Sequence, residues 1–157
     1  RDLQEVKKIV EKNSFIISKI KTKKAVINLD KIIKNSDALL IDRGDLSRYV
    51  SIEKIPVAQE NIIKRSTKLN KPTYVATNLL ESMINENQPT RAESHDVYST
   101  LKEGAKGLVL AAETAIGKNP IECVRFIKRC ISVFKRKNNK QMFERNVTKN
   151  YLFRFTL

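Results

Sequence analysis

Four short apolar runs, rich in β-branched residues, are separated by segments with helical spacing. The runs cover residues 14–20, 38–41, 73–76 and 107–110. Apolar runs this short, with few polar interruptions, are typical of buried parallel strands. Successive runs begin 24 to 35 residues apart, which is enough for one strand and one helix. The sequence therefore predicts an α/β fold in which parallel strands alternate with helices through right-handed crossovers.

The segments around these runs carry apolar residues at helical spacing. Pro120 is placed to occupy the first position of the last helix, where proline is favoured. The pattern predicts helices over residues 2–12, 25–34, 52–69, 92–103 and 120–134.

Four strand–helix units cannot close a (β/α)₈ barrel, which typically needs about 250 residues. The chain has 157 residues, so periodicity leaves two alternatives, half of such a barrel or a small open α/β sheet. In either case, functional side chains are expected in the loops at the carboxyl ends of the strands.

Positive charge is concentrated near the end of the chain. The whole sequence has 31 Lys and Arg against 17 Asp and Glu, for a net charge of +14, and its last 33 residues hold ten bases and one acid. We predict a barrel domain over residues 1–137 and a basic tail, helical or extended, over residues 138–157. The tail could attract polyanions. Few aromatic residues and no nucleic-acid motif accompany it, so nucleic-acid binding is only a third alternative behind the two functions described below.

The two cysteines, Cys123 and Cys130, are seven residues apart on one predicted helix. That spacing separates their Cα atoms by about 10 Å, beyond the reach of a disulfide. Free thiols indicate a reducing compartment, so we expect a cytoplasmic protein, or an organellar one if a transit peptide precedes this sequence. A zinc site of cysteines and histidines is excluded because His95 is the single histidine. No apolar stretch approaches the ~18 residues of a membrane span.

Charged side chains follow the first two predicted strands. Lys19 and Lys21 alternate with apolar residues, so they should point to the same side and repel each other unless an anion or carboxylate lies between them. Asp42, Gly44 and Asp45 follow the second run. Gly44 allows close approach of a ligand to the backbone, and Asp45 could ligate a hard divalent cation.

The loops after the third and fourth runs carry further polar groups. Thr77 is placed to offer a hydroxyl to a substrate, and Glu113 and Thr114 are expected at the same mouth. Thr90 and Glu93 have the spacing of a capping box, which predicts a structural role for both at the start of a helix.

Several peptides, in this order, resemble the pyruvate kinase family, and the resemblance extends from about Asp2 to Arg145. They are SKI at 18–20, RGDL at 43–46, VATNLLESM at 75–83, PTRAES at 89–94 and LAAETAIGKNPIECV at 110–124.

The resemblance implies that the chain is the last four βα units of a TIM barrel. It places Lys19 beside the transferred phosphoryl group, Gly44 and Asp45 in the loop that holds the substrate carboxylate and the divalent cation, and Thr77 near the enolate face of the substrate. The implied glycolytic reaction moves phosphoryl from phosphoenolpyruvate to ADP, giving pyruvate and ATP, with Mg²⁺ or Mn²⁺ and K⁺. The implied partners are the remainder of the barrel or another chain, in a homo-oligomer.

The sequence departs from the family pattern at three places. Lys21 stands where the family has a metal-binding glutamate, Asp42 replaces a small residue, and Ala111 with Ala112 replaces a Ser-Gly pair. Our hypothesis is that Asp42 either pairs with Lys21 or partly replaces the missing carboxylate as a metal ligand. Two functions follow: a phosphotransferase to which this chain supplies part of the active site, or a degenerate homologue with a binding or assembly role.

Overall fold

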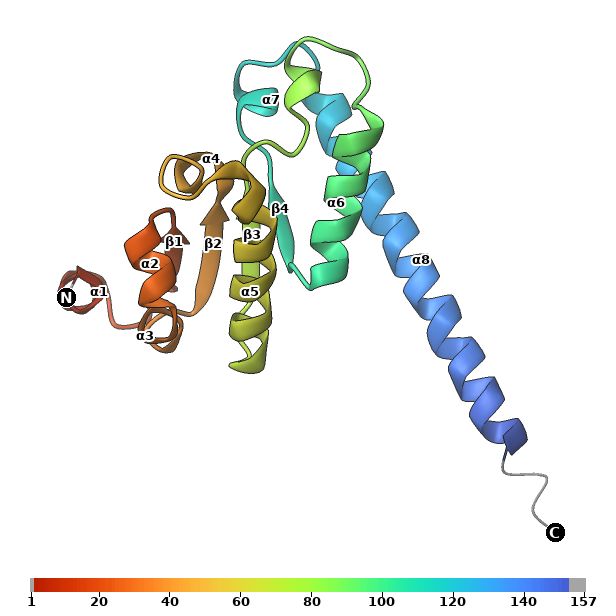
Figure 1. Cartoon of the computed structure of the whole chain (residues 1–157), viewed down its shortest axis with the longest axis horizontal. Coiled ribbons are helices and arrows are strands. Elements are labelled where there is room, and N and C mark those ends of the chain that lie inside the picture. The colour runs from red at the N-terminus through yellow and green to blue at the C-terminus, as the bar shows by residue number, and fades with distance from the viewer. Residues whose placement is uncertain (1, 153–157) are drawn as a thin grey trace.

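The computed structural model describes residues 2–152, with side-chain placement for residues 3–139. Its centre is a four-stranded parallel sheet in the order β1-β2-β3-β4. The strands are Ile17–Ile20, Ala38–Asp42, Thr73–Ala76 and Gly107–Val109. Helices follow each strand (Figure 1), so the predicted fold class, α/β with parallel strands alternating with helices, is confirmed.

The first strand is shorter than predicted. It begins at Ile17 because Ile17 is paired with Ala38, the first residue of β2, and residues 14–16 extend beyond that partner. The amide of Ile16 instead donates to the Asp37 carboxylate, at 2.8 Å.

Each predicted helical segment contains a helix, but the bounds differ, and the short helices Arg43–Leu46 and Ala112–Ala115 have no counterpart among the predicted segments. The predicted helix over 25–34 is two helices that meet at Asn28, whose backbone ends one helix and precedes the next. The helices are α1 Asp2–Ile9, α2 Lys23–Ile27, α3 Leu29–Lys34, α4 Arg43–Leu46, α5 Ile55–Lys68, α6 Arg91–Glu103, α7 Ala112–Ala115 and α8 Pro120–Leu152, with 3₁₀ turns at Ile52–Lys54 and Glu81–Ile84.

One face of the sheet packs against helices. Ile20, Leu39, Ile41 and Val75 are buried there in one apolar cluster that also contains Ile62 of α5. Burying an aliphatic side chain contributes about 1.5–3 kcal/mol, so this cluster fixes the sheet against α3 and α5. A second cluster joins the loop after β3 to α6 and α8.

The opposite face of the sheet carries Ile17, Lys19, Leu40, Tyr74 and Val109 in register. Ile17 is 50% exposed and Val109 is 38% exposed. An apolar sheet face that its own helices leave open is the face that would lie inside a closed barrel.

The last helix, α8, passes through the predicted boundary between the domain and the basic tail (Figure 1). Residues 153–157 of that tail lie outside the described residues, and the boundary at 137 stays a prediction. Cys123 and Cys130 of this helix are free thiols, as predicted. Within residues 2–152, no helix is both long enough and apolar enough to cross a membrane.

Candidate functional site

The carboxyl ends of β1 and β2 bring two lysines and two aspartates together. The Lys19 Nζ atom lies 2.5 Å from Asp42 Oδ2 and 3.5 Å from Asp45 Oδ2. The Lys21 Nζ atom lies 3.8 Å from the same oxygen of Asp45. As strand alternation predicts, the two lysines share one side, and a carboxylate lies between them.

We expected Asp42 either to pair with Lys21 or to act as a metal ligand. The predicted pairing is wrong, because Asp42 pairs with Lys19 rather than with Lys21. Pairing between β1 and β2 ends at Ile20 and Ile41. Lys21 therefore lies beyond the last paired residue and reaches Asp45, whereas Lys19 points along the same sheet face toward Asp42.

Asp42 connects three segments of the site although it is only 6% exposed. Its Oδ1 atom accepts hydrogen bonds from the Asp45 amide at 3.0 Å and from the Thr77 hydroxyl at 3.2 Å. Burial raises the pKa of the Asp42 carboxyl, but these bonds and the Lys19 ammonium outweigh it and hold the pKa below its usual value. The hydrogen bond to Asp42 in turn raises the pKa of Lys19. Both groups are therefore charged at neutral pH.

Thr77 is held in a strained backbone conformation at the end of β3. Its φ is 69°, and that of Asn78 is 55°. The left-handed region is costly for a β-branched residue and persists only where neighbours enforce it. The Thr77 hydroxyl accepts a hydrogen bond from the Gly44 amide at 2.8 Å, so that amide is already engaged within the protein.

Arg43 stabilises this strained turn, a role that the sequence alone does not reveal. Its guanidinium donates to the carbonyls of Thr77 and Asn78 at 2.8–3.1 Å and forms a 2.7 Å ion pair with Asp96 of α6. The one sequence feature that could have indicated this role is the position of Arg43 directly after a buried strand. Its partner, 53 residues away, could not be read from the sequence.

Glu113 does not face the mouth of the site, so that expectation is wrong. The side chain is 2% exposed and accepts hydrogen bonds from the amides of Leu80 at 3.3 Å and Ala111 at 2.9 Å. These bonds join the loops that follow β3 and β4. Thr114 donates to the Ala111 carbonyl at 3.1 Å, within its own turn.

Glu93 has the predicted structural role. It completes the capping box with Thr90 and also accepts hydrogen bonds from the Ser82 amide at 2.7 Å and the Ser82 hydroxyl at 2.5 Å. Burial raises the pKa of Glu93, but the bonds from Ser82 and Thr90 outweigh it and lower the pKa below its usual value.

The described residues do not fit a divalent cation in this arrangement. Mg²⁺ requires several oxygen ligands in near-octahedral geometry. Both carboxylates of the site already contact ammonium groups, and Asp45 also lies 3.9 Å from Arg48. Among the described residues, no group of three or more His, Cys, Asp or Glu side chains could hold a metal ion.

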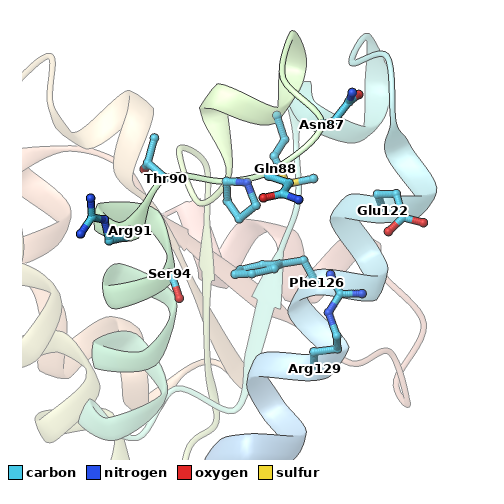
Figure 2. Close-up of a pocket in the computed structure, with 10 residues that line it drawn as sticks. Asn87, Gln88, Thr90, Arg91, Ser94, Glu122, Phe126 and Arg129 are labelled. Carbon is cyan, nitrogen blue, oxygen red and sulfur yellow. The ribbon is translucent and has the colours of Figure 1, made fainter.

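A separate cavity of ≈390 Å³ lies between the loop before α6 and the start of α8. Figure 2 shows Phe126 projecting from α8 into it, with Glu122 and Arg129 on the same helix. None of the predicted site residues lines this cavity, so it is distinct from the lysine–aspartate cluster.

Comparison with known proteins defines the family. A family model described as the pyruvate kinase barrel domain matches residues 1–124. The chain is 47% identical over 114 residues to a pyruvate kinase of Thermotoga maritima, covering 73% of this chain and 24% of that protein. It is 44% identical over 124 residues to the chloroplastic pyruvate kinase isozyme G of Ricinus communis, covering 79% of this chain and 30% of that protein.

The chain therefore belongs to the pyruvate kinase family, and its residues 1–124 match part of the barrel domain. It spans between about a quarter and a third of the length of these two relatives.

Proposed function

We propose that this chain supplies part of the active site of a phosphotransferase that moves phosphoryl from phosphoenolpyruvate to ADP, forming pyruvate and ATP. The observation that carries the proposal is the convergence of Lys19, Asp45 and Thr77 around Asp42 at the carboxyl ends of three adjacent strands. This is the end of a barrel sheet where the reactive groups of such enzymes gather.

In this proposal Lys19 stabilises negative charge on the phosphoryl group during transfer. A fixed ammonium is effective there because its field is in place before charge develops. Gly44 and Asp45 shape the loop that receives the substrate carboxylate, and Thr77 faces the enolate carbon. The Gly44 amide would have to exchange Thr77 for the carboxylate when substrate binds, since Thr77 accepts its hydrogen bond in this structure.

The family's reaction uses Mg²⁺ or Mn²⁺ and K⁺, and Asp45, with Asp42 as a second possibility, was the metal ligand predicted from the resemblance. The described residues do not fit a divalent cation, so the proposed roles of Lys19, Gly44, Asp45 and Thr77 involve no bound metal ion.

The remainder of the barrel, or another chain, is the proposed partner. Strands β1 and β4 lie at the edges of the described sheet, and unpaired strand edges tend to associate. The exposure of Ile17 and Val109 on the open sheet face supports the same partner. We also propose that the complete protein is a homo-oligomer.

A lactate dehydrogenase-coupled assay on the full-length polypeptide tests the phosphotransferase. We expect pyruvate formation from phosphoenolpyruvate and ADP, and a loss of about 10²-fold or more in kcat for Lys19→Met, the scale of removing one charge-stabilising donor. An absence of turnover with Mg²⁺, with Mn²⁺ and without divalent ions would refute catalysis.

The second candidate is a homologue that binds without turnover. Two observations favour this candidate. The Lys19 ammonium is already paired with two carboxylates. Lys21 also stands where the resemblance implies a metal-binding glutamate. The melting temperature of the full-length protein, measured with and without phosphoenolpyruvate, tests this candidate. A rise in melting temperature without turnover would support it over the first.

A further inference from the structure

The carboxylates of the site are balanced by cations that the chain itself supplies. Lys19 contacts both Asp42 and Asp45, and Lys21 contacts Asp45. These four side chains carry two formal positive and two formal negative charges, and Arg48 adds a third cation 3.9 Å from Asp45. The site therefore needs no bound ion to neutralise its aspartates.

We infer that the Lys21 ammonium is the resident cation of this site and prevents a divalent metal ion from binding to Asp45. Mg²⁺ or Mn²⁺ bound to an Asp45 oxygen would lie within a few ångströms of Lys21, whose Nζ is 3.8 Å from that carboxylate. Repulsion between a unit charge and a divalent ion at such a distance costs about 2 kcal/mol even at the dielectric constant of water.

The second carboxylate cannot easily compensate. The Asp42 oxygens are engaged by Lys19, by the Asp45 amide and by the Thr77 hydroxyl. A metal ion using Asp42 would have to displace Lys19 from a buried oxygen as well as Lys21 from Asp45.

The consequence for the substrate rests on the proposed function. A phosphorylated carboxylic acid such as phosphoenolpyruvate would meet ammonium groups at this edge, where a metal-containing site would present an ion. Its binding would then be independent of divalent cations.

Mn²⁺ titration followed by electron paramagnetic resonance tests the inference without requiring activity. The 157-residue chain should show no saturable Mn²⁺ site. Lys21→Glu removes the cation and adds a third carboxylate beside Asp42 and Asp45, so it should gain a saturable Mn²⁺ site at least about a hundredfold tighter than any residual Mn²⁺ binding by the unchanged chain. Lys21→Arg should behave like the unchanged chain because it keeps the charge.

Lys68→Glu is the matched control, since Lys68 is an exposed residue near the end of α5 and the substitution changes the net charge equally. It should gain no Mn²⁺ site. Saturable binding to the unchanged chain that Asp45→Asn abolishes would overturn the inference. So would a Lys21→Glu chain with an unaltered circular dichroism spectrum and no gain in Mn²⁺ affinity. Lys21→Gln removes the charge without adding a ligand, so it should give a smaller gain in Mn²⁺ affinity. This variant keeps the test decisive if Lys21→Glu fails to fold.

A second measurement separates this inference from the proposed function. The full-length protein is melted with phosphoenolpyruvate in EDTA and again with Mg²⁺. Equal stabilisation in both supports the inference, whereas stabilisation that requires Mg²⁺ overturns it and leaves the proposed function standing. If phosphoenolpyruvate stabilises neither sample, the proposed substrate is wrong, and the Mn²⁺ titration alone decides the role of Lys21.

Discussion

Replacing Asp42 by alanine should destabilise the protein more than its single ion pair suggests. The carboxylate contacts Lys19 Nζ at 2.5 Å, the Asp45 amide at 3.0 Å and the Thr77 hydroxyl at 3.2 Å. These partners belong to three different segments, so one substitution loosens the ends of β1 and β3 and the start of α4 together.

The expected loss follows from these contacts taken in turn. Removing the side chain that caps α4 costs about 1 kcal/mol. The ion pair contributes at most about 1 kcal/mol because Lys19 is half-exposed. Losing the bond to Thr77 costs about 0.5–1 kcal/mol, at the low end because its hydroxyl also reaches the Ala76 carbonyl. We therefore expect the free energy of unfolding to fall by about 1.5–2.5 kcal/mol.

Urea denaturation of the 157-residue chain measures this loss. Asp42→Asn keeps an acceptor for the Asp45 amide and should lose about half as much. Asp30→Ala is the matched control, since Asp30 forms an exposed ion pair with Arg65 and should cost less than about 1 kcal/mol. If Asp42→Ala costs no more than Asp30→Ala, Asp42 does not connect these segments energetically.

Three further substitutions or measurements probe the scaffold. Glu93→Ala should cost about 2–3 kcal/mol at pH 7. Because the fold lowers the pKa of Glu93, the difference from the unchanged chain should be largest above the ordinary pKa of a glutamate and should shrink as pH falls through the lowered value. Urea unfolding at stepped pH tests this, with exposed Glu86→Ala as control, and a difference independent of pH would contradict it. Gly107→Ala places a Cβ 2.5 Å from the Tyr74 ring and should cost about 1–3 kcal/mol, partly recovered when Tyr74→Ala is added; additive losses in that double-mutant cycle would refute the clash. The Cys123 thiol, fully buried and with a pKa raised by burial, should react with Ellman's reagent only on unfolding, so fast reaction in the folded chain would show that α8 opens locally.

The strands were predictable because their signal is local. The third strand has the bounds that its apolar run predicts, and the second differs by one residue. The capping box of Thr90 and Glu93 was also predictable, since both partners lie within one helical turn. The break at Asn28 was not, because the apolar spacing continues through it.

The pairing of charges in the site required the fold. The sequence predicts that Lys19 and Lys21 share a side, but the choice of carboxylate depends on strand register, which pairs Lys19 with Leu40. The position of Glu113 also depends on the fold. From the sequence, Glu113 was expected at the mouth of the site because it follows the fourth strand. Only the folded loops show that two backbone amides occupy its oxygens.

The conformation of the Thr77 turn does not depend on the charge of Lys21. The turn at Thr77 is enforced by Arg43, which is itself anchored to Asp96, and none of these contacts involves Lys21. A change of charge at residue 21 can therefore alter which ions the site accepts while the strand ends keep their positions. If Lys21 excludes a divalent cation as we infer, the arrangement of Lys19 and Thr77 does not depend on that exclusion. Variants of Lys21 therefore test which ions bind to the site without disturbing its geometry, whereas variants of the Thr77 turn would change both.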